Sequence, residues 1–419
     1  MPTRKRIVII GTGIAGSTAA VSARSQDSCA EIILIGEEPH FPYDRTHLSK
    51  QQLDENANLS TSILITSAAF KELNIHLVTG VKVRELHTDE HFIVLDNGEQ
   101  YLYDKLIVAT GSSVRPLPDS WGCINDERIH SVRTAEDSHR LRIALGKSEK
   151  IVVIGAGLIG LEVAAVAREK GIDVTVVGPG KRILTRSCDE VTADRLESIH
   201  RDNGVHFRLG MSVEAIRKLT SGELEVLLSD GSTLAADNVV VGIGVLPNVA
   251  VVSGTDIEIN DGIVVDRFGQ TNIPDIFAAG EVVSLLDETG TSNFRLETWR
   301  HSQEHGRLVG ENVLNNEMRA YELNSSFWSD QYGHRLQGVG LIPPENYNLI
   351  VRAYDDHSHI SFCIGANQKL LAVVGLDDSK DVNAVGRLVG FPLTISTEVL
   401  EDASKPLVPL VKSILKKMK

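Results

Sequence analysis

Short apolar runs that end on glycine give the chain two similar halves, followed by a different tail. Ile7–Ile10 precede the glycine-rich segment Gly11–Gly16, and Ile151–Ile154 precede Gly155–Gly160. Each glycine-rich segment leads into an alanine-rich stretch. In both places this pattern predicts a short buried strand, a tight turn and a helix.

The remaining apolar segments of the two halves follow the same order: a second strand, an alternating stretch with a turn, and a buried strand that ends on glycine. In the first half they are Glu31–Ile35, the residues from Val81 with the turn Asn97-Gly98, and Leu106–Ala109 ending on Thr110-Gly111. In the second half they are Val174–Val177, the segments Val213–Ile216 and Leu224–Leu228 with the turn Asp230-Gly231, and Val239–Val241 ending on Gly242–Gly244. Asn-Gly and Asp-Gly between alternating residues predict hairpins. We therefore expect one architecture used twice, a parallel sheet interrupted by a small antiparallel meander.

The pattern changes twice after Leu246. A single strand is predicted at Asp275–Gly280, followed by a helix over about 300–315. We expect this strand to join the sheet of the first half. We therefore expect the second unit to be inserted into the first. From Glu322 the chain has aromatic and glycine-rich strand segments and ends in a basic amphipathic helix, Leu407–Lys419, which predicts a separate α+β domain.

Composition narrows the class of protein. The chain has 419 residues, 42% of them hydrophobic and 23% charged, which is ordinary for a soluble globular protein of two or three domains. Its formal net charge of −14 argues against nucleic acid as a partner. No apolar run approaches the roughly 20 residues of a membrane span, so we expect a cytoplasmic protein that does not enter the membrane. The four cysteines are scattered, so neither a disulfide, a metal site nor a redox dithiol is expected, and buried inert thiols are the simplest interpretation.

The two glycine-rich segments match the fingerprint of dinucleotide-binding turns. Gly11 and Gly155 make the turn, Gly13 and Gly157 let the backbone approach a pyrophosphate, and Gly16 and Gly160 allow close packing of helix and strand. The phosphates then lie at the helix N-terminus. Two fingerprints in matched settings imply two dinucleotides and electron transfer between them.

An acid at the end of the second strand distinguishes the two halves. Glu37 stands there in the first half and suits a ribose hydroxyl, whereas Gly178 occupies the place in the second. Lys181 and Arg182 follow Gly178, and they are either a binding site for the 2′-phosphate of NADPH or an ordinary solvated loop. The choice between NADH and NADPH therefore stays open.

Several further segments carry a resemblance to a known family. They are Pro42–Lys50 (Pro-Tyr-Asp-Arg-Thr-His-Leu-Ser-Lys), Ala109-Thr110-Gly111, Gly244–Asn248, Phe277–Gly280, Leu296–Trp299 and Phe327–Gln331. Together with both fingerprints, the chain resembles the FAD-dependent ferredoxin reductases that serve Rieske dioxygenases and bacterial cytochromes P450. The resemblance covers essentially the whole chain. Pro42–Lys50 stands where glutathione reductase-like relatives carry a redox dithiol, so its lack of cysteine excludes disulfide chemistry.

The resemblance implies a fold, its domains and its cofactors. The fold is α/β, with two Rossmann-like dinucleotide-binding domains of the glutathione reductase-like kind, the second inserted in the first, and a C-terminal α+β domain. Residues 1–115 and 245–321 would bind FAD, residues 116–244 would bind NADH or NADPH, and residues 322–419 would form the C-terminal domain. The electrons would go to a [2Fe–2S] ferredoxin or a rubredoxin, and the protein would be a monomer or a weak homodimer.

The fingerprints and the resemblance together assign residues to the two cofactors. For FAD they are Gly11, Gly13, Ala15, Gly16, Glu37, Arg45, Lys50, Val83, Ala109, Thr110, Gly111, Arg133, Gly280, Glu281 and Trp299. Glu297 is placed near the nicotinamide, and Thr298 is a further cofactor-binding residue. For the nicotinamide dinucleotide they are Gly155, Gly157, Leu158, Ile159, Gly160, Glu162, Gly178, Lys181, Arg182 and Gly244. Arg45 and Arg133 suit a pyrophosphate. Gly280-Glu281 is expected at a helix N-terminus, where the family usually has Asp in place of Glu281.

Lys50 and Glu162 form the expected catalytic pair. The resemblance implies that the Lys50 ammonium approaches flavin N5 and that Glu162, on the first turn of its helix, holds the ammonium. Glu162 has a structural alternative, as an acid that satisfies the helix dipole. Trp328 and Asp330 would border the ferredoxin docking surface. The basic end, with Lys412, Lys416, Lys417 and Lys419, either attracts an acidic ferredoxin or is a solvated helix face.

Two other functions are weighed against electron transfer to a ferredoxin. An NAD(P)H oxidase or peroxidase normally has a redox cysteine where this chain has Thr46–Lys50. A flavin-bearing NADH sensor like apoptosis-inducing factor would answer with dimerisation rather than turnover, and the sequence has no targeting segment that favours it.

Overall fold

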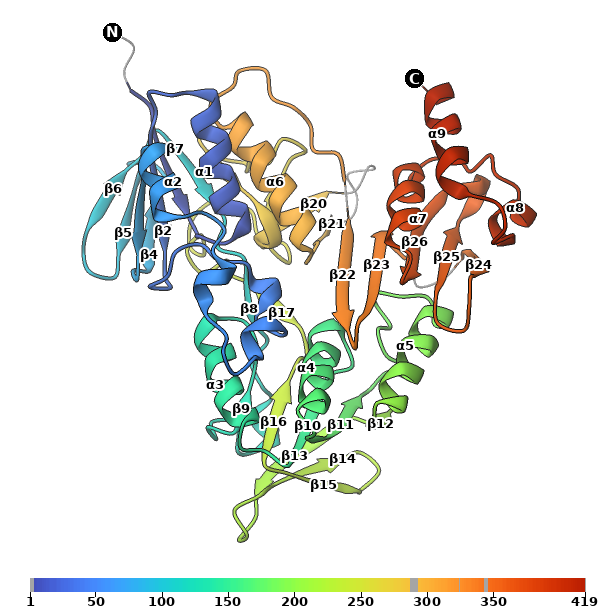
Figure 1. Cartoon of the computed structure of the whole chain (residues 1–419). Coiled ribbons are helices and arrows are strands. Elements are labelled where there is room, and N and C mark those ends of the chain that lie inside the picture. The colour runs from blue at the N-terminus through green and yellow to red at the C-terminus, as the bar shows by residue number, and fades with distance from the viewer. Residues whose placement is uncertain (1–3, 287–292, 324, 343–345, 419) are drawn as a thin grey trace. The chain divides into compact units, whose positions relative to one another are not determined.

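The computed structural model contains two five-stranded parallel sheets, and each includes the strand that precedes one glycine fingerprint (Figure 1). The structure describes residues 4–286, 293–323, 325–342 and 346–418. These form two units: one has residues 1–46, 58–113 and 245–324, and the other has 47–57, 114–244 and 325–419. Residues 47–57, which the sequence analysis places in the FAD domain, thus pack with the second unit.

The first unit is built on the sheet β19-β7-β1-β2-β3, in which every neighbouring pair is parallel. Its strands are β1 (Arg6–Ile10), β2 (Glu31–Gly36), β3 (Ile75–Thr79), β7 (Lys105–Val108) and β19 (Ile276–Ala278). Because β19 pairs with β7 from far along the chain, the predicted insertion of the second unit into the first is confirmed.

Smaller elements complete the first unit. Helices α1 (Ile14–Gln26) and α6 (Trp299–Asn312) pack side by side, and a Cβ on Gly306 or Gly310 would overlap the α1 backbone (Figure 1). The predicted helix over about 300–315 thus begins one residue earlier and ends three residues earlier. The others are α2 (Ser67–Glu72), the meander β4 (Val83–His87), β5 (Phe92–Leu95) and β6 (Gln100–Leu102), the sheet β18 (Ile263–Val265), β20 (Val283–Leu286) and β21 (Asn293–Phe294), and the pair β8 (Ser112–Val114) and β17 (Val245–Pro247).

The second unit repeats this plan with the sheet β12-β11-β10-β16-β9, again all parallel. Its strands are β9 (Ile129–His130), β10 (Lys150–Ile154), β11 (Asp173–Gly178), β12 (Val205–Leu209) and β16 (Asn238–Val241), with the meander β13 (Val213–Lys218), β14 (Leu224–Leu228) and β15 (Thr233–Ala236) and the helices α3 (Ala135–Leu145), α4 (Leu158–Glu169) and α5 (Glu190–Asp202). The predicted double use of one architecture is confirmed.

An antiparallel sheet of order β22-β23-β26-β25-β24 forms the C-terminal part of the second unit. Its strands are β22 (Ser326–Gln331), β23 (His334–Gly340), β24 (Asn348–Ala353), β25 (His359–Ile364) and β26 (Leu370–Leu376), followed by α7 (Ser379–Val385), α8 (Thr397–Glu401) and α9 (Leu407–Met418). Apolar residues of the sheet and helices share one core, which makes this part α+β as predicted.

Candidate functional site

The first fingerprint has the geometry that a phosphate-binding turn requires. Gly11 follows β1 with φ +112°, and its amide donates to the carbonyl of Ile35 at 2.7 Å. A Cβ on Gly11 would overlap the Ala109 carbonyl, and one on Gly16 would overlap the Gly11 carbonyl. At Gly13 a Cβ would meet no described protein atom within 4 Å. The first and third glycines are therefore fixed by the fold, whereas the second leaves open space beside it.

The second fingerprint repeats this arrangement position by position. Gly155 has φ +115°, and a Cβ there would overlap the Gly242 carbonyl. A Cβ on Gly160 would overlap the Gly155 carbonyl, and one on Gly157 would meet no described atom within 4 Å. The two turns therefore leave open space at the same place, beside the first residue of the following helix.

The helices that follow the fingerprints begin without a side-chain cap. Gly13 is the N-cap of α1 and Gly157 that of α4, and glycine has no side chain to accept a hydrogen bond. Helices α2, α3, α5, α6 and α7 begin at residues whose side chains accept from the first turn, namely Thr66, Thr134, Asp189, Thr298 and Asp378, whereas the five-residue α8 also begins without such a cap. Because uncapped N–H groups attract anions, both turns fit the pyrophosphate of a dinucleotide.

The two strand ends that contact the ribose in such folds differ here. Glu37 directly follows β2, is exposed and pairs with Lys82 at 2.8 Å. Gly178 ends β11, is buried, and would place a Cβ 3.3 Å from the Cβ of Ala156. Lys181 is exposed, whereas the Arg182 guanidinium donates to the Cys188 carbonyl at 2.9 Å. Arg182 thus has a role in folding its own loop.

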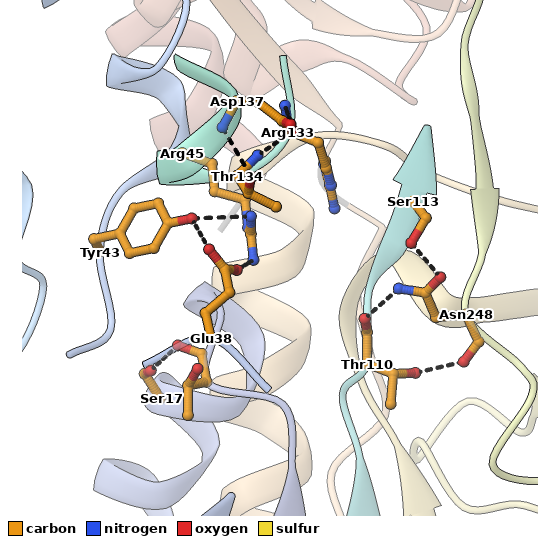
Figure 2. Close-up of polar contacts among 11 residues, drawn as sticks. Ser17, Glu38, Tyr43, Arg45, Thr110, Ser113, Arg133, Thr134, Asp137 and Asn248 are labelled. Atoms are coloured by element: carbon orange, nitrogen blue, oxygen red, sulfur yellow. Dashed lines mark hydrogen bonds and ion pairs between the residues drawn. The ribbon is translucent and has the colours of Figure 1, made fainter. Parts of the chain in front are cut away.

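Arg45 is held by a partner that the sequence analysis missed. Its Nη2 donates to Glu38 Oε1 at 2.5 Å, its Nη1 donates to the Tyr43 hydroxyl at 3.2 Å, and that hydroxyl donates to Glu38 (Figure 2). Burial lowers the pKa of Arg45, but Tyr43 and Glu38 outweigh it and raise the pKa above its ordinary value. Nothing in the sequence separates Glu38 from its neighbour Glu37, so only the fold assigns this contact.

Arg133 belongs to the second unit, just before α3. Its backbone N–H donates to Asp137 Oδ2 at 3.1 Å, and its side chain is half-buried. Asp137 also closes the capping box with Thr134 that starts α3 (Figure 2). The fold thus fixes the Arg133 backbone.

Two motifs of the family interlock in the first unit. Asn248 donates to the Thr110 carbonyl at 3.0 Å and accepts from Ser113, while the Thr110 hydroxyl donates to the Asn248 carbonyl at 2.7 Å (Figure 2). The backbone N–H of Asn248 also donates to the Gly111 carbonyl. These bonds fix the loop after β7, which holds Ala109.

Two other predicted residues lie elsewhere. Gly244, at φ +101°, belongs to the second unit, and Val83 is buried in the core of the first unit.

The helix expected to begin at Gly280-Glu281 is only a single 3-10 turn, Gly280–Val282. The chain then continues as β20, because Val283–Leu285 pair in parallel with β18. The Glu281 carboxylate accepts from the Ser112 hydroxyl at 2.6 Å. Arg295 donates to the Glu281 carbonyl at 3.3 Å and to Glu297 at 2.6 Å.

The α6 helix begins in this region and carries two buried histidines. Thr298 caps it and the half-buried Trp299 is its first residue. His305 Nδ1 accepts from the Gly280 amide at 3.2 Å, and His301 stacks on His305 with ring centroids 5.2 Å apart. Burial lowers the pKa of His301 to about 4. Both rings are therefore neutral parts of the support behind Gly280.

Lys50 and Glu162 meet within the second unit. Lys50 Nζ lies 2.9 Å from Glu162 Oε1, and the side chains are 11% and 3% exposed. Glu162 also accepts from the hydroxyls of Ser49 and Ser329. The expected place of Glu162 on the first turn is wrong, because Glu162 is the fifth residue of α4.

The cysteines offer no redox pair among the described residues. All four are free thiols, with Cys188 and Cys363 buried. Cys29 is exposed and Cys123 half-buried, so the expectation of four buried thiols is wrong for these two. Burial raises the pKa of Cys363 to about 12. Within the described ranges no cluster of His, Cys, Asp and Glu suits a metal ion, and no helix is long and apolar enough to cross a membrane.

Comparison with known proteins agrees with this site. A family model described as pyridine nucleotide-disulphide oxidoreductase matches residues 5–306, and one described as reductase C-terminal matches residues 326–411. The chain belongs to the pyridine nucleotide-disulphide oxidoreductase family. More particularly, it is an oxidoreductase of the ferredoxin reductase type that uses FAD and NAD(P)H, as its sequence predicts.

Individual relatives cover nearly the whole chain. The ferredoxin–NAD(+) reductase component of the p-cumate 2,3-dioxygenase system of Pseudomonas putida is 39% identical over 96% of this chain and 97% of its own. Putidaredoxin reductase of the same organism is 31% identical over 98% of both chains. The crystal structure of the covalent putidaredoxin reductase–putidaredoxin complex matches with a TM-score of 0.91 at 31% identity, over 98% of this chain and 99% of that chain.

Proposed function

We propose that this protein oxidises NADH and passes the electrons, through FAD, to a [2Fe–2S] ferredoxin that serves an oxygenase. The pair of matched, uncapped glycine turns carries the proposal, because it provides two dinucleotide sites and the chain offers no dithiol between them. The relatives named ferredoxin–NAD(+) reductase components of dioxygenase systems support the acceptor.

The domains and residues follow the expectation from sequence. Residues 1–115 and 245–321 would hold FAD, with Gly13 at the pyrophosphate and Glu37 at the ribose. Residues 116–244 would hold NADH, with Gly157 at its pyrophosphate. When bound, FAD accepts a hydride from the nicotinamide and releases the electrons singly. The protein's own part is to orient the two dinucleotides, and Lys50, held by Glu162, would provide a fixed positive charge for the reaction.

NADH is the proposed donor in preference to NADPH. Arg182, one of two candidate cations for a 2′-phosphate, already donates to the Cys188 carbonyl. Lys181 is exposed, and an ion pair between an exposed ammonium and the 2′-phosphate would add little to the binding of NADPH. Ferredoxin–NAD(+) reductases among the relatives favour the same choice.

Residues 322–419 would form the docking domain. Trp328 is half-buried on β22, and Asp330 is exposed and pairs with Arg335 at 2.9 Å. Lys412, Lys416 and Lys417 are exposed on α9, and Lys419 lies outside the described residues. A rubredoxin is the alternative acceptor.

Localisation and oligomeric state complete the proposal. The four free thiols suit a cytoplasmic protein. The proposed oligomeric state is a monomer or a weak homodimer.

Coupled turnover tests the proposal. NADH-dependent reduction of cytochrome c is measured with candidate [2Fe–2S] ferredoxins and a rubredoxin, at low and high salt. We expect turnover that requires a ferredoxin and that falls with salt if the docking face is charged. Absence of turnover with every carrier, together with a long-lived reduced flavin, would contradict the proposal.

A further inference from the structure

A line of buried hydrogen bonds runs from the Glu162 carboxylate into the C-terminal sheet. Ser329 on β22 donates to Glu162 Oε1 at 2.5 Å. Gln331 Nε2 donates to the Ser329 hydroxyl at 2.8 Å, and Gln331 Oε1 lies 2.6 Å from Nε2 of His200 on α5. Ser329 and His200 are 0% exposed and Gln331 is 3% exposed, so the whole line is shielded from water.

The alternation of β22 separates this line from the exposed side of the strand. Ser329 and Gln331 are buried, whereas Asp330 between them is exposed. Successive side chains of a strand point to opposite faces, so one face of β22 is polar and enclosed. Enclosed polar groups cost free energy unless they are hydrogen-bonded, and each of these two side chains has partners on both sides.

The line has a defined direction. Burial lowers the pKa of His200 to about 4, so the ring is neutral near pH 7. The Gln331 oxygen only accepts, which requires the hydrogen on His200 Nε2. His200 therefore donates to Gln331, Gln331 to Ser329, and Ser329 to Glu162. Bonds aligned in this way strengthen one another.

At the Glu162 end of this line of hydrogen bonds, every contact suits a negative charge. Glu162 accepts from Ser49, Lys50 and Ser329, which are all donors. These three donors fix the positions of both carboxylate oxygens, because Ser49 binds Oε2 while Lys50 and Ser329 bind Oε1.

We infer that Ser329, oriented by Gln331, is a positioning residue that holds the Glu162 carboxylate in line with the Lys50 ammonium. Its kinetic consequence rests on the proposed function, because only there does the Lys50–Glu162 pair serve flavin reduction. The C-terminal domain thereby supplies part of the support for the catalytic pair.

Other charges on the neighbouring elements lie at the surface. Helix α4 packs against β10, β11 and β22. The charged residues of these strands, Lys150, Asp173 and Asp330, are exposed. Lys50 and, through Gln331, His200 are therefore the titratable groups that the described structure places on the Glu162 network.

The test compares Ser329→Ala with a matched control. Ser361, on β25, is also 0% exposed and donates to a buried carboxylate, that of Asp189, at 3.1 Å. Ser361→Ala therefore removes the same kind of bond at a distant place in the same sheet. Ser329→Thr restores the hydroxyl at the first site.

Two readouts are measured on the FAD-loaded proteins. The first is the limiting rate constant of flavin reduction by NADH in stopped flow. The second is the dissociation constant for NADH, taken from the dependence of that rate on the NADH concentration. In Ser329→Ala we expect a limiting rate constant about 10-fold below wild type and a dissociation constant within about twofold of wild type.

The inference is overturned if Ser329→Ala keeps the wild-type rate constant, or if Ser361→Ala shows the same loss. Ser329→Thr should return the rate constant to that of wild type. Gln331→Leu keeps the Ser329 hydroxyl but removes its donor, so it should lower the rate constant in the same way, and it replaces Ser329→Ala if that variant does not fold. If neither NADH nor NADPH reduces the wild-type flavin, the proposed function fails and the inference is overturned with it.

Discussion

The buried Glu162 carboxylate has three hydrogen-bond donors around it. Glu162 accepts from one cation and two hydroxyls while 3% exposed. The sequence predicted the pairing with Lys50 through the family resemblance. It did not predict Ser49 and Ser329 as partners, because they come from segments far apart in the chain, and serine in a strand has no signature of its own.

Replacing this carboxylate tests its role. Glu162→Gln keeps the shape but leaves the Lys50 ammonium without a charged partner, so we expect flavin reduction by NADH to slow about 100-fold. Stopped-flow absorbance of the flavin measures the rate. Glu169→Gln, at an exposed position on the same helix, is the control and should keep the wild-type rate. Equal rates in both variants would remove Glu162 from the mechanism.

Coenzyme preference is also decided by individual side chains. Lys181→Ala should raise the KM for NADPH up to about fivefold, the range of an exposed ion pair, and leave the KM for NADH unchanged. Arg182→Ala should lower the melting temperature, because the bond to the Cys188 carbonyl is lost, without changing the ratio of the two KM values. The reverse pattern would assign the 2′-phosphate contact to Arg182.

Among the elements, the strand-turn-helix units were the most predictable from sequence. The apolar runs and glycines fix both turns locally, so β1, α1, β10 and α4 appear where the pattern places them. Gly280-Glu281 could not be predicted in this way. Its continuation into β20 follows from pairing with β18, a tertiary contact that leaves no local pattern. Likewise, Glu38 rather than Glu37 holds Arg45 only because of how the loop folds back.

The two kinds of glycine in a turn should respond differently to alanine. Gly157→Ala meets no described atom within 4 Å and has φ −89°, so the protein should keep its melting temperature but bind NADH more weakly. Gly155→Ala would overlap the Gly242 carbonyl at φ +115° and should destabilise the fold. Thermal unfolding and the KM for NADH measure the two effects. A normal KM in Gly157→Ala would mean that the pyrophosphate does not lie at this turn.

The buried histidines of α6 give the protein an acid sensitivity. The pKa of His301 is about 4 in the fold because of burial, against about 6.5 when unfolded. The unfolded chain therefore binds a proton that the folded one does not, and stability falls as the pH drops from 6.5 towards 4, by up to about 1.4 kcal/mol per pH unit. His301→Leu should make the urea midpoint less dependent on pH over this range. An unchanged dependence would show that His301 does not carry it.

For the whole molecule, the central claim is that the chain binds two dinucleotides and sends electrons outward to a protein. The fold class and the family were predictable because two fingerprints and six family segments occur in order along the chain. Nothing in the sequence indicates that residues 47–57 group with the second compact unit, because their contacts are made with residues distant in sequence. The C-terminal part of the chain is α+β as expected, and its line of hydrogen bonds to Glu162 is visible only in the fold.

Anaerobic titration of the FAD-loaded protein tests this claim most directly. The flavin absorbance is followed as NADH or NADPH is added in steps, and a [2Fe–2S] ferredoxin is then mixed in. We predict bleaching complete at about one equivalent of NADH and reoxidation of the flavin by the ferredoxin. Failure of both NADH and NADPH to bleach the flavin up to equimolar addition would contradict the account.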